Sequence, residues 1–434
     1  MKRVGYLWHE VLERSNLLRA YHQAARGKRH KQEVQRFSAD LDANLDRLRA
    51  ELESGSYETG HCNVFKVYDP KERTIHAARF EERVFHHALM NLCEPVLERQ
   101  AVFHSYACRE GKGRLKAIAV AQQAARRQAW HLKLDIRKYF ESIPHGKLMS
   151  RLQRVFKDPH VLHWLDQLIR GHRGAEGKGL PIGSLTSQHL ANFYLGPLDR
   201  KCQGFPGVHA YARYMDDFVC WADNKADLLA ADREIQCYVV ETLGLELKHP
   251  PSPQRSARGM DFLGYRIFPT HTELNRRSKR RYQRRLSLLG QLHSRHMISE
   301  SRLQQRLTAA TAFCLPVRSH GFRLRAMEKN WTLAIGLQPC ATGRQLEQQR
   351  QQLPRCEPQQ QQPGQLQQQQ RFPGRPQLRP GLQPDRAVVS MGLNRPASGS
   401  RRIHRRDEAL NAPLGASSTV DAVSNAPSGD SSKL

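Results

Sequence analysis

Three aspartates in two short apolar segments are the residues of this chain best placed to do chemistry. Asp135 lies near the end of an alternation of apolar and polar residues over 130–136, which predicts a half-buried strand with the carboxylate on its polar face. Asp216 and Asp217 lie between two apolar and aromatic runs in AYARYMDDFVCWAD (210–223), which predict two strands joined at the aspartates. A turn would explain a lone aspartate. Turn chemistry is an alternative for the pair as well, but adjacent carboxylates repel each other, which favours a bound cation.

Three carboxylates on neighbouring strand ends would form a hard-oxygen site for Mg²⁺, with Mn²⁺ able to substitute. Magnesium prefers carboxylates combined with substrate phosphates. Two such ions about 3.5–4 Å apart can clamp the attacking and leaving oxygens of an in-line phosphoryl displacement. The aspartates therefore predict phosphoryl-transfer chemistry.

The charge of the chain points to the substrate of that chemistry. The 434 residues include 69 Lys and Arg against 41 Asp and Glu, a formal net charge of +28. The segment from Gln338 onward holds only 13 of the basic and 7 of the acidic residues, so most of the excess lies on the part that can fold. Nucleic acid is the first expectation for a partner and an anionic membrane surface the second. Nucleotidyl transfer on a nucleic acid is the predicted reaction.

Other function classes and locations are disfavoured by composition. No apolar run approaches the ~18–20 residues of a membrane-spanning helix, so no membrane is expected. The nine cysteines show no C-x-x-C spacing, which disfavours a disulfide framework or a zinc site. We therefore expect a reducing, cytoplasmic location.

The elements that must position the aspartates can be outlined from periodicity. Helical spacing runs through residues 1–60, strands with a turn at Asp69-Pro70 are expected over 62–79, and a helix is expected through Phe85 and Val96. Later segments are an Ala-rich helix within 105–129, a very basic helical stretch over 276–312, and a Gln/Pro-rich and then Ser/Ala-rich tail over 338–434 that we expect to be disordered.

Several motifs, in order along the chain, resemble those of reverse transcriptases. The Asp135 strand running into Tyr139-Phe140, the segment GLPIGSLTSQHLANFYLGPLD (179–199) and YMDD (214–217) resemble motifs A, B and C of that family, and MDFLGYRIF (260–268) resembles its primer grip. Two further segments, KVYDPKERTIHAARFEERVFHHAL (66–89) and SYACREGKG (105–113), resemble its fingers motifs.

The resemblance implies an α+β fold, a right-hand polymerase with helical fingers, a palm with an antiparallel sheet and a helical thumb. The implied division is an N-terminal basic helical extension (1–60), fingers (61–129), palm (130–268, with finger elements at 140–190), thumb (269–337) and a disordered tail (338–434).

Within that family, the sequence is most similar to enzymes of diversity-generating retroelements. IGSLTSQ (182–188) has Ile and Gln where relatives of group II introns read Gln and Pro, and the basic stretch after the primer grip is a further likeness. The resemblance implies error-prone copying of a template-repeat RNA, with misincorporation opposite adenine, and a small basic accessory protein as partner. A retron-like or group II intron-derived enzyme and an inactive RNA-binding scaffold are the alternatives.

The resemblance also implies roles for individual residues. Asp135 and Asp216 would bridge two Mg²⁺ ions with the carbonyl of Ile136, while Asp217 would add charge. The primer grip would comprise Phe262, Leu263, Gly264 and Tyr265. Contacts to the backbone of an RNA–DNA duplex would come from Arg276, Arg277, Lys279, Arg280 and Arg281. Binding of the incoming dNTP would fall to Arg73, Lys71, Lys66, Phe140 (as a steric gate), Ile182, Gly183, Gln188 and Lys248, the last of these beside the leaving pyrophosphate.

Two details of motif B are also open to test. Ile182 offers no hydrogen bond to a nucleotide, and loss of polar readout should loosen selection between right and wrong pairs. Ser187 is a candidate cap for the helix that begins near it.

Overall fold

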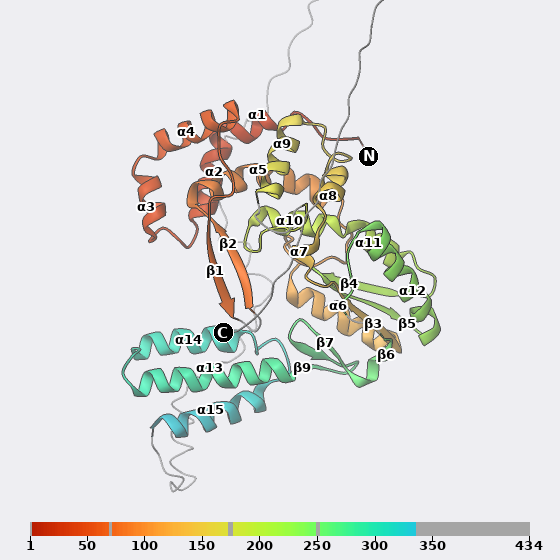
Figure 1. Ribbon diagram of the computed structural model, residues 1–434. Coiled ribbons are helices and arrows are strands. Elements are labelled where there is room, and N and C mark those ends of the chain that lie inside the picture. The colour runs from red at the N-terminus through yellow and green to blue at the C-terminus, as the bar shows by residue number, and fades with distance from the viewer. Residues whose placement is uncertain (1, 69–71, 172–176, 249–251, 336–434) are drawn as a thin grey trace, which may run out of the picture. The chain divides into compact units, whose positions relative to one another are not determined.

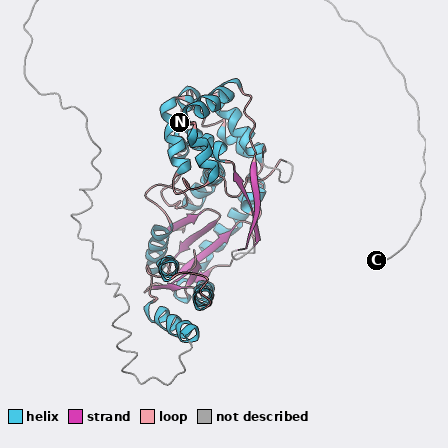
Figure 2. Cartoon of the chain, turned by 90° about the vertical axis from the view of Figure 1, so that its left-hand side faces the viewer, coloured by secondary structure: helices cyan, strands magenta, loops and turns pink. Residues whose placement is uncertain are grey.

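The computed structural model describes residues 2–68, 72–171, 177–248 and 252–335 (Figure 1). The segment 338–434, expected to be disordered, lies outside the described residues, as does the Asp69-Pro70 turn. Among the described residues, no helix is long and apolar enough to cross a membrane. The described strands form three sheets, which Figure 2 draws in magenta.

The first sixty residues form four helices, as their spacing predicts. These helices are α1 (Trp8–Leu12), α2 (Arg14–Ala25), α3 (Gln32–Ala39) and α4 (Leu41–Ser54). In α2, Leu17, Tyr21 and Ala24 repeat at helical spacing and are buried. They belong to a large apolar core shared with the long helix α5 (Phe80–Glu98).

A two-stranded hairpin precedes α5. Strands β1 (Cys62–Tyr68) and β2 (Glu72–Ala78) pair antiparallel, from Cys62 opposite Ala78 to Tyr68 opposite Glu72. Both strands were predicted, and both are confirmed. Most residues of β1 are exposed, so the hairpin packs little of its surface into the core.

The central sheet carries the aspartates. Its order is β4-β5-β3-β6, all pairs antiparallel. Its strands are β3 (Trp130–Asp135), β4 (Ala210–Tyr214), β5 (Asp217–Ala222) and β6 (Gln254–Arg255). Each face of this sheet packs against an apolar cluster, because alternate residues of β5 enter different cores.

Helices surround the central sheet. Helix α6 (Arg114–Arg127) contacts β4, while α11 (Gly196–Gln203) and α12 (Lys225–Cys237) pack against the sheet and each other. The remaining connecting helices are α7 (Tyr139–Ser142), α8 (His145–Leu152), α9 (Pro159–Arg170), α10 (Leu185–Tyr194), the π-helix η1 (Tyr238–Thr242) and the 3-10 helix η2 (Ser256–Arg258).

The last described part is a small sheet followed by three helices. Strands β7 (Met260–Phe262), β8 (Tyr265–Ile267) and β9 (Thr272–Leu274) form an antiparallel sheet in that order. The helices are α13 (Arg276–Ser294), α14 (Glu300–Ala312) and α15 (His320–Ile335). The predicted basic stretch over 276–312 is thus two helices, separated near His296, whose positive φ of 54° does not continue a helix.

Candidate active site

Strand pairing brings Asp135 and Asp217 together. Asp135 is the last residue of β3 and pairs directly with Asp217, the first residue of β5. Directly opposed residues of an antiparallel pair project from the same face, with Cβ atoms about 4.5–5.5 Å apart. Asp216 precedes Asp217 in the turn from β4. All three aspartates therefore lie at one end of the central sheet.

The turn itself differs from the one expected. The sequence predicts that Asp216 and Asp217 form it, whereas Asp217 already pairs with Tyr214 and the turn consists of Met215 and Asp216. Met215 has the positive φ of 59°. Asp217 pairs with Asp135 of β3 and with Tyr214 of β4, so its backbone is extended. The left-handed conformation that the turn needs is therefore adopted by Met215.

Two lysines lie against two of the carboxylates. Lys248 Nζ donates to Asp135 Oδ2 at 2.7 Å, and its backbone N–H donates to the Asp135 carbonyl at 2.9 Å. Lys133 Nζ lies 3.2 Å from Asp217 Oδ1. That oxygen is buried and accepts no well-directed hydrogen bond. The lysines supply positive charge to a site rich in carboxylates.

The carboxylates also influence one another. Burial is the main cause that raises the pKa of Asp217 to about 6; Lys133 opposes the shift, and Asp135 and Asp216 add to it. The pKa of Asp216 is also raised, mainly by burial and then by Asp135, against the charges of Arg73 and Lys248. A bound cation would offset the burial and like charge that raise the pKa of Asp216 and Asp217.

The carboxylate oxygens of the three aspartates are suitable ligands for a hard divalent cation, but they are not already arranged around one binding position. Among the described residues, no group of three or more His, Cys, Asp or Glu side chains is arranged to hold a metal ion. Lys248 contacts Oδ2, one of the two Asp135 oxygens that could bind a metal. A cation bound through Oδ2 would have to displace the Lys248 ammonium.

An open groove gives access to Asp135 and to the two lysines. It has a volume of about 600 Å³ and is lined by residues that include Asp135, Lys133, Lys248, Arg258 and Arg266. Four of its six charged lining residues are cations, the other two being Asp135 and Asp261, and this excess of positive charge suits a polyanionic substrate.

Comparison with known families identifies the fold around this site. Residues 69–267 match the family described as "Reverse transcriptase (RNA-dependent DNA polymerase)". This segment includes all three aspartates. The chain carries a reverse transcriptase domain. RNA-directed DNA polymerase is the activity of that domain.

Individual relatives match with low identity. Protein YkfC of Escherichia coli (strain K12) is 25% identical over 278 residues, covering 53% of this chain and 72% of that protein. The putative COX1/OXI3 intron 1 protein of Saccharomyces cerevisiae is 22% identical over 174 residues, covering 38% of this chain and 21% of that protein. The match thus spans about a fifth of the yeast protein. A structure titled apo telomerase from Candida tropicalis, truncated from the C-terminal domain, aligns at 11% identity and a TM-score of 0.37, covering 49% of this chain and 55% of that one.

In the reverse transcriptase domain, the hairpin contributes one cation to the aspartates. Arg73 of β2 is near enough for its charge to lower the pKa of Asp216. Lys66 instead pairs with Glu72 across the hairpin at 2.6 Å. Lys71 lies outside the described residues. Of the two described cations, Arg73 is the one whose charge reaches Asp216.

The motif B loop lies against the same hairpin. The Ile182 carbonyl accepts a hydrogen bond from the His76 N–H at 2.9 Å. Gly183 has a φ of 108°, and a Cβ there would lie 2.9 Å from Cγ2 of Ile75. Only glycine fits this close approach. This close approach is to β2, and the contact of Gly183 with a dNTP stays a prediction.

Three other motif residues can be placed in the structure. Phe140 is half-buried beside the core, and Gln188 Oε1 accepts a hydrogen bond from Cys108 Sγ at 3.4 Å. Their contacts with a dNTP stay predictions. The prediction that Ser187 caps a helix is wrong. Helix α10 has Ser184 at its N-cap, and Ser187 is buried in its first turn.

The primer-grip residues divide into two groups. Phe262 and Tyr265 are buried, and the Tyr265 ring stacks on Phe313 at 4.8 Å between centroids. Leu263 and Gly264 form the turn between β7 and β8, both with positive φ. Only the turn residues could contact a primer directly; the two aromatic side chains anchor the turn to the helices that follow.

The cations of α13 lie beyond the family match. Arg276, Arg277, Arg280 and Arg281 are exposed. Lys279 pairs with Glu273 at 2.8 Å. Four of the five predicted backbone contacts therefore lie on an accessible helix surface.

Sequence reasoning missed two sets of residues beside the aspartates. Lys133 was detectable, because it precedes Asp135 by two residues and so shares its face of β3. The buried ion pair of Arg213 and Asp199 was not, because its partners come from β4 and α11. The only sequence signal is one arginine within an apolar strand.

Proposed function

We propose that this chain copies RNA into DNA by two-metal nucleotidyl transfer, with Asp135 and Asp216 as the carboxylates that hold two Mg²⁺ ions. The observation that carries the proposal is the direct pairing of Asp135 with Asp217, beside Asp216, inside a reverse transcriptase domain. When bound, the ions lower the pKa of the primer 3′-hydroxyl and stabilise charge on the pyrophosphate. Asp217 and the Ile136 carbonyl complete the proposed site.

The proposed reaction balances without a dedicated protein base. The primer 3′-hydroxyl gives up its proton to solvent water, its oxygen attacks the α-phosphorus of the dNTP, and the bond from that phosphorus to the pyrophosphate oxygen breaks. Arg73 would bind the triphosphate from the hairpin side. Lys248, at 2.7 Å from Asp135, would be released toward the leaving pyrophosphate as the ions bind.

The right-hand division is part of the same proposal. The 61–129 region would form the fingers, 130–268 the palm, with finger elements at 140–190, and 269–337 the thumb, after an N-terminal extension over 1–60. Support comes from β3, β4 and β5 lying in one antiparallel sheet and from α13, α14 and α15 following it as a helical unit. One boundary cuts through a sheet, because β9 at Thr272–Leu274 pairs with β8.

We further propose the diversity-generating retroelement type, with a template-repeat RNA, a small basic accessory protein and a cytoplasmic location. The motif B residues Ile182 and Gln188 support this type. A group II intron-derived enzyme is the second candidate, because relatives carry intron names.

Primer extension tests the activity. The purified chain is incubated with poly(rA)/oligo(dT), dTTP and Mg²⁺, beside an Asp216→Asn variant. We expect extension by the wild type. The extension rate of the variant should be lower by at least about 100-fold, because the substitution removes the negative charge of a proposed metal ligand. Equal extension by both proteins would contradict the site, and extension by neither would support an RNA-binding scaffold.

Sequencing of products tests the retroelement type. On a mixed-sequence RNA template, we expect errors concentrated opposite adenine. A neighbouring variable-repeat and template-repeat pair in the DNA would provide independent support. Errors spread evenly over the four template bases, without such a repeat pair, would favour the intron-derived enzyme.

A further inference from the structure

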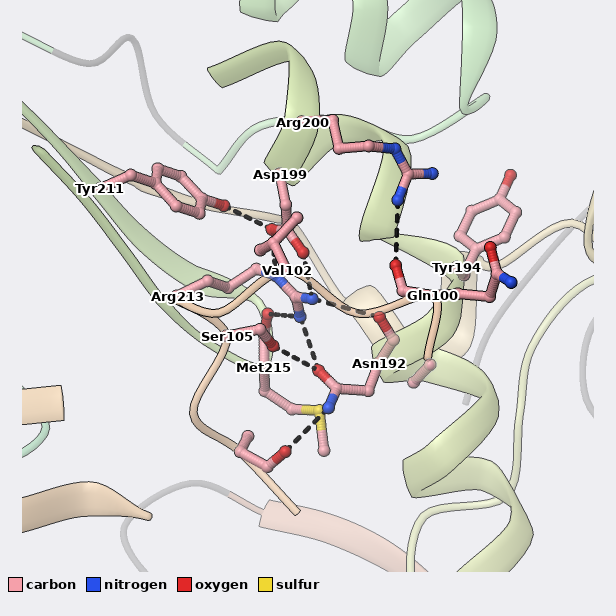
Figure 3. A network of polar contacts seen from close by, with 12 residues as sticks. Gln100, Val102, Ser105, Asn192, Tyr194, Asp199, Arg200, Tyr211, Arg213 and Met215 are labelled. Atoms are coloured by element: carbon pink, nitrogen blue, oxygen red, sulfur yellow. Dashed lines mark hydrogen bonds and ion pairs between the residues drawn. The ribbon is translucent and has the colours of Figure 1, made fainter. Parts of the chain in front are cut away.

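The Arg213 side chain is fully buried behind the turn that carries Asp216. Figure 3 shows its guanidinium at the centre of a polar network. Nε and Nη2 donate to the two carboxylate oxygens of Asp199 at 2.5 and 2.7 Å. Nη1 donates to Asn192 Oδ1 at 2.8 Å and to the Met215 carbonyl at 2.9 Å, and Nη2 also reaches the Asn192 carbonyl at 3.2 Å. A guanidinium has five N–H donors, and all five are used.

The contact with Met215 fixes the peptide that leads into Asp216. Met215 has a φ of 59°, which a residue with a side chain adopts only when its surroundings enforce it. Its carbonyl and the Asp216 N–H belong to the same planar peptide. Holding that carbonyl therefore sets the direction in which the Asp216 backbone leaves the turn.

The network also connects the turn to elements outside the sheet. Asn192 of α10 donates from Nδ2 to the Ala107 carbonyl at 2.8 Å. The backbone of Arg213 exchanges hydrogen bonds with His104 and Tyr106, each at 2.9 Å. One arginine thus ties the turn to α10, to α11 and to the segment before α6.

Stability alone does not explain an arginine here. A buried ion pair gains little over apolar residues of similar volume, since desolvation offsets the attraction. A lysine could neutralise Asp199 but lacks the fork that also reaches Asn192 and Met215.

We propose that Arg213 is a positioning residue for nucleotidyl transfer: by holding the Met215 carbonyl, it fixes Asp216 in register with Asp135 and Asp217. This inference rests on the proposed function. It assigns Asn192 to orienting the guanidinium and Asp199 to neutralising it.

Arg213→Lys and Asn192→Ala test the proposal, with Tyr211→Phe as the matched control. Tyr211 donates its hydroxyl to Asp199 Oδ1 at 2.6 Å, so its loss removes a buried bond to the same carboxylate without touching the turn. The assays are kcat and KM for dTTP on poly(rA)/oligo(dT), together with thermal unfolding. We expect Arg213→Lys to lower kcat about 10- to 100-fold with KM for dTTP within about twofold, because misplacement affects the transition state and not substrate binding.

The control separates positioning from destabilisation. Tyr211→Phe should lower the unfolding temperature while keeping kcat within about twofold. Equal kcat in Arg213→Lys and Tyr211→Phe would overturn the inference while leaving the polymerase proposal standing. An inactive wild type would overturn both. Should Arg213→Lys fail to fold, Asn192→Ala decides, because it leaves the pair of Arg213 and Asp199 in place: a reduced kcat supports the inference, and an unchanged one contradicts it.

Discussion

At the scale of single residues, the site is defined by ammonium groups next to carboxylates. Lys248 lies 2.7 Å from Asp135, and Lys133 lies 3.2 Å from Asp217. A lysine that contacts a metal ligand competes with the metal for it. The strength of that competition is limited, since both members of the Lys248–Asp135 pair are about one-third exposed.

Lys248→Met should therefore lower the Mg²⁺ concentration that gives half-maximal extension. A pair of this exposure contributes at most about 1 kcal/mol, so the shift should not exceed about fivefold. The measurement is a Mg²⁺ titration of primer extension at saturating dTTP.

Lys248→Arg is the control for that titration, because it keeps a cation beside Asp135. An unchanged or higher Mg²⁺ requirement in Lys248→Met would contradict the competition. A lower kcat in both variants would assign the lysine ammonium to the leaving pyrophosphate, the role that the family resemblance implies.

Ile182→Gln should improve base selection. The Ile182 carbonyl is fixed to His76 by a 2.9 Å hydrogen bond, so the new amide would project from the same backbone position. Polar readout discriminates better than apolar contact, and we expect misincorporation opposite adenine to fall about 10-fold. Product sequencing checks this, with Ile182→Leu as the apolar control; an error rate shared by Gln and Leu would refute the role.

The sequence could indicate some of these residues and not others. Asp135, Asp216 and Asp217 follow from local alternation and adjacency, which a single sequence contains. The pairing of Arg213 with Asp199 depends on how α11 packs against β4, and no local pattern encodes that contact.

At the scale of elements, the central sheet is covered on both faces. Trp221 and Val219 of β5 enter one core, while Phe218 and Cys220 enter the other. The sequence predicts β3 as half-buried, yet His131 on its polar face is also buried. Packing from β7 and β8 covers that face, and alternation alone could not reveal it.

The burial of His131 predicts a pH-dependent stability. Burial and then Lys133 lower the pKa of His131 to about 4, below its ordinary value of 6.5. The unfolded chain therefore binds the proton more readily, and stability is lost as pH falls from about 6.5 to 4. This linkage amounts to up to about 3 kcal/mol.

Urea unfolding at pH 7 and pH 4.5 measures that linkage. His131→Leu should lose less of its free energy of unfolding over this range than the wild type does. His22→Leu, at an exposed position, should behave like the wild type. An identical pH response in the wild type and His131→Leu would show that the buried imidazole is not responsible.

The exposed arginines of α13 should contribute to the salt dependence of duplex binding. Replacing Arg276, Arg277 and Arg280 by Gln should weaken binding to an RNA–DNA duplex and reduce the slope of log K against log salt by about 2 to 3, because each lost phosphate contact contributes about 0.7–0.9. Fluorescence anisotropy from low to moderate salt measures the slope. The matched control replaces the exposed Arg99, Arg154 and Arg233 by Gln. An equal change of the slope in both triple variants would show that net charge is responsible and not the position of the arginines on α13.

Turn and cap geometry is the part of the elements that sequence predicted least well. The turn falls on Met215 and Asp216 because Asp217 is held in two ladders. Helix α10 begins after Ser184, three residues before the predicted cap. The turn differs because strand pairing overrides the local turn preference of the two aspartates.

At the scale of the whole molecule, the order of motifs along the chain predicted the family. The reverse transcriptase match over 69–267 includes motif A, the motif B loop and YMDD. The predicted mixture of helices and sheet is confirmed, as are the strands predicted around Asp135 and on either side of Asp216. The division into fingers, palm and thumb stays a proposal, as do the partners.

Crystallography with Mn²⁺ tests the central claim most directly. Crystals of the full chain with template, primer and a non-hydrolysable dTTP analogue would be soaked in Mn²⁺, and anomalous difference maps calculated. We predict two peaks about 3.5–4 Å apart, contacting the carboxylates of Asp135 and Asp216, with Lys248 displaced from Asp135. Maps with nucleotide bound but no anomalous peak between those two carboxylates would contradict the account.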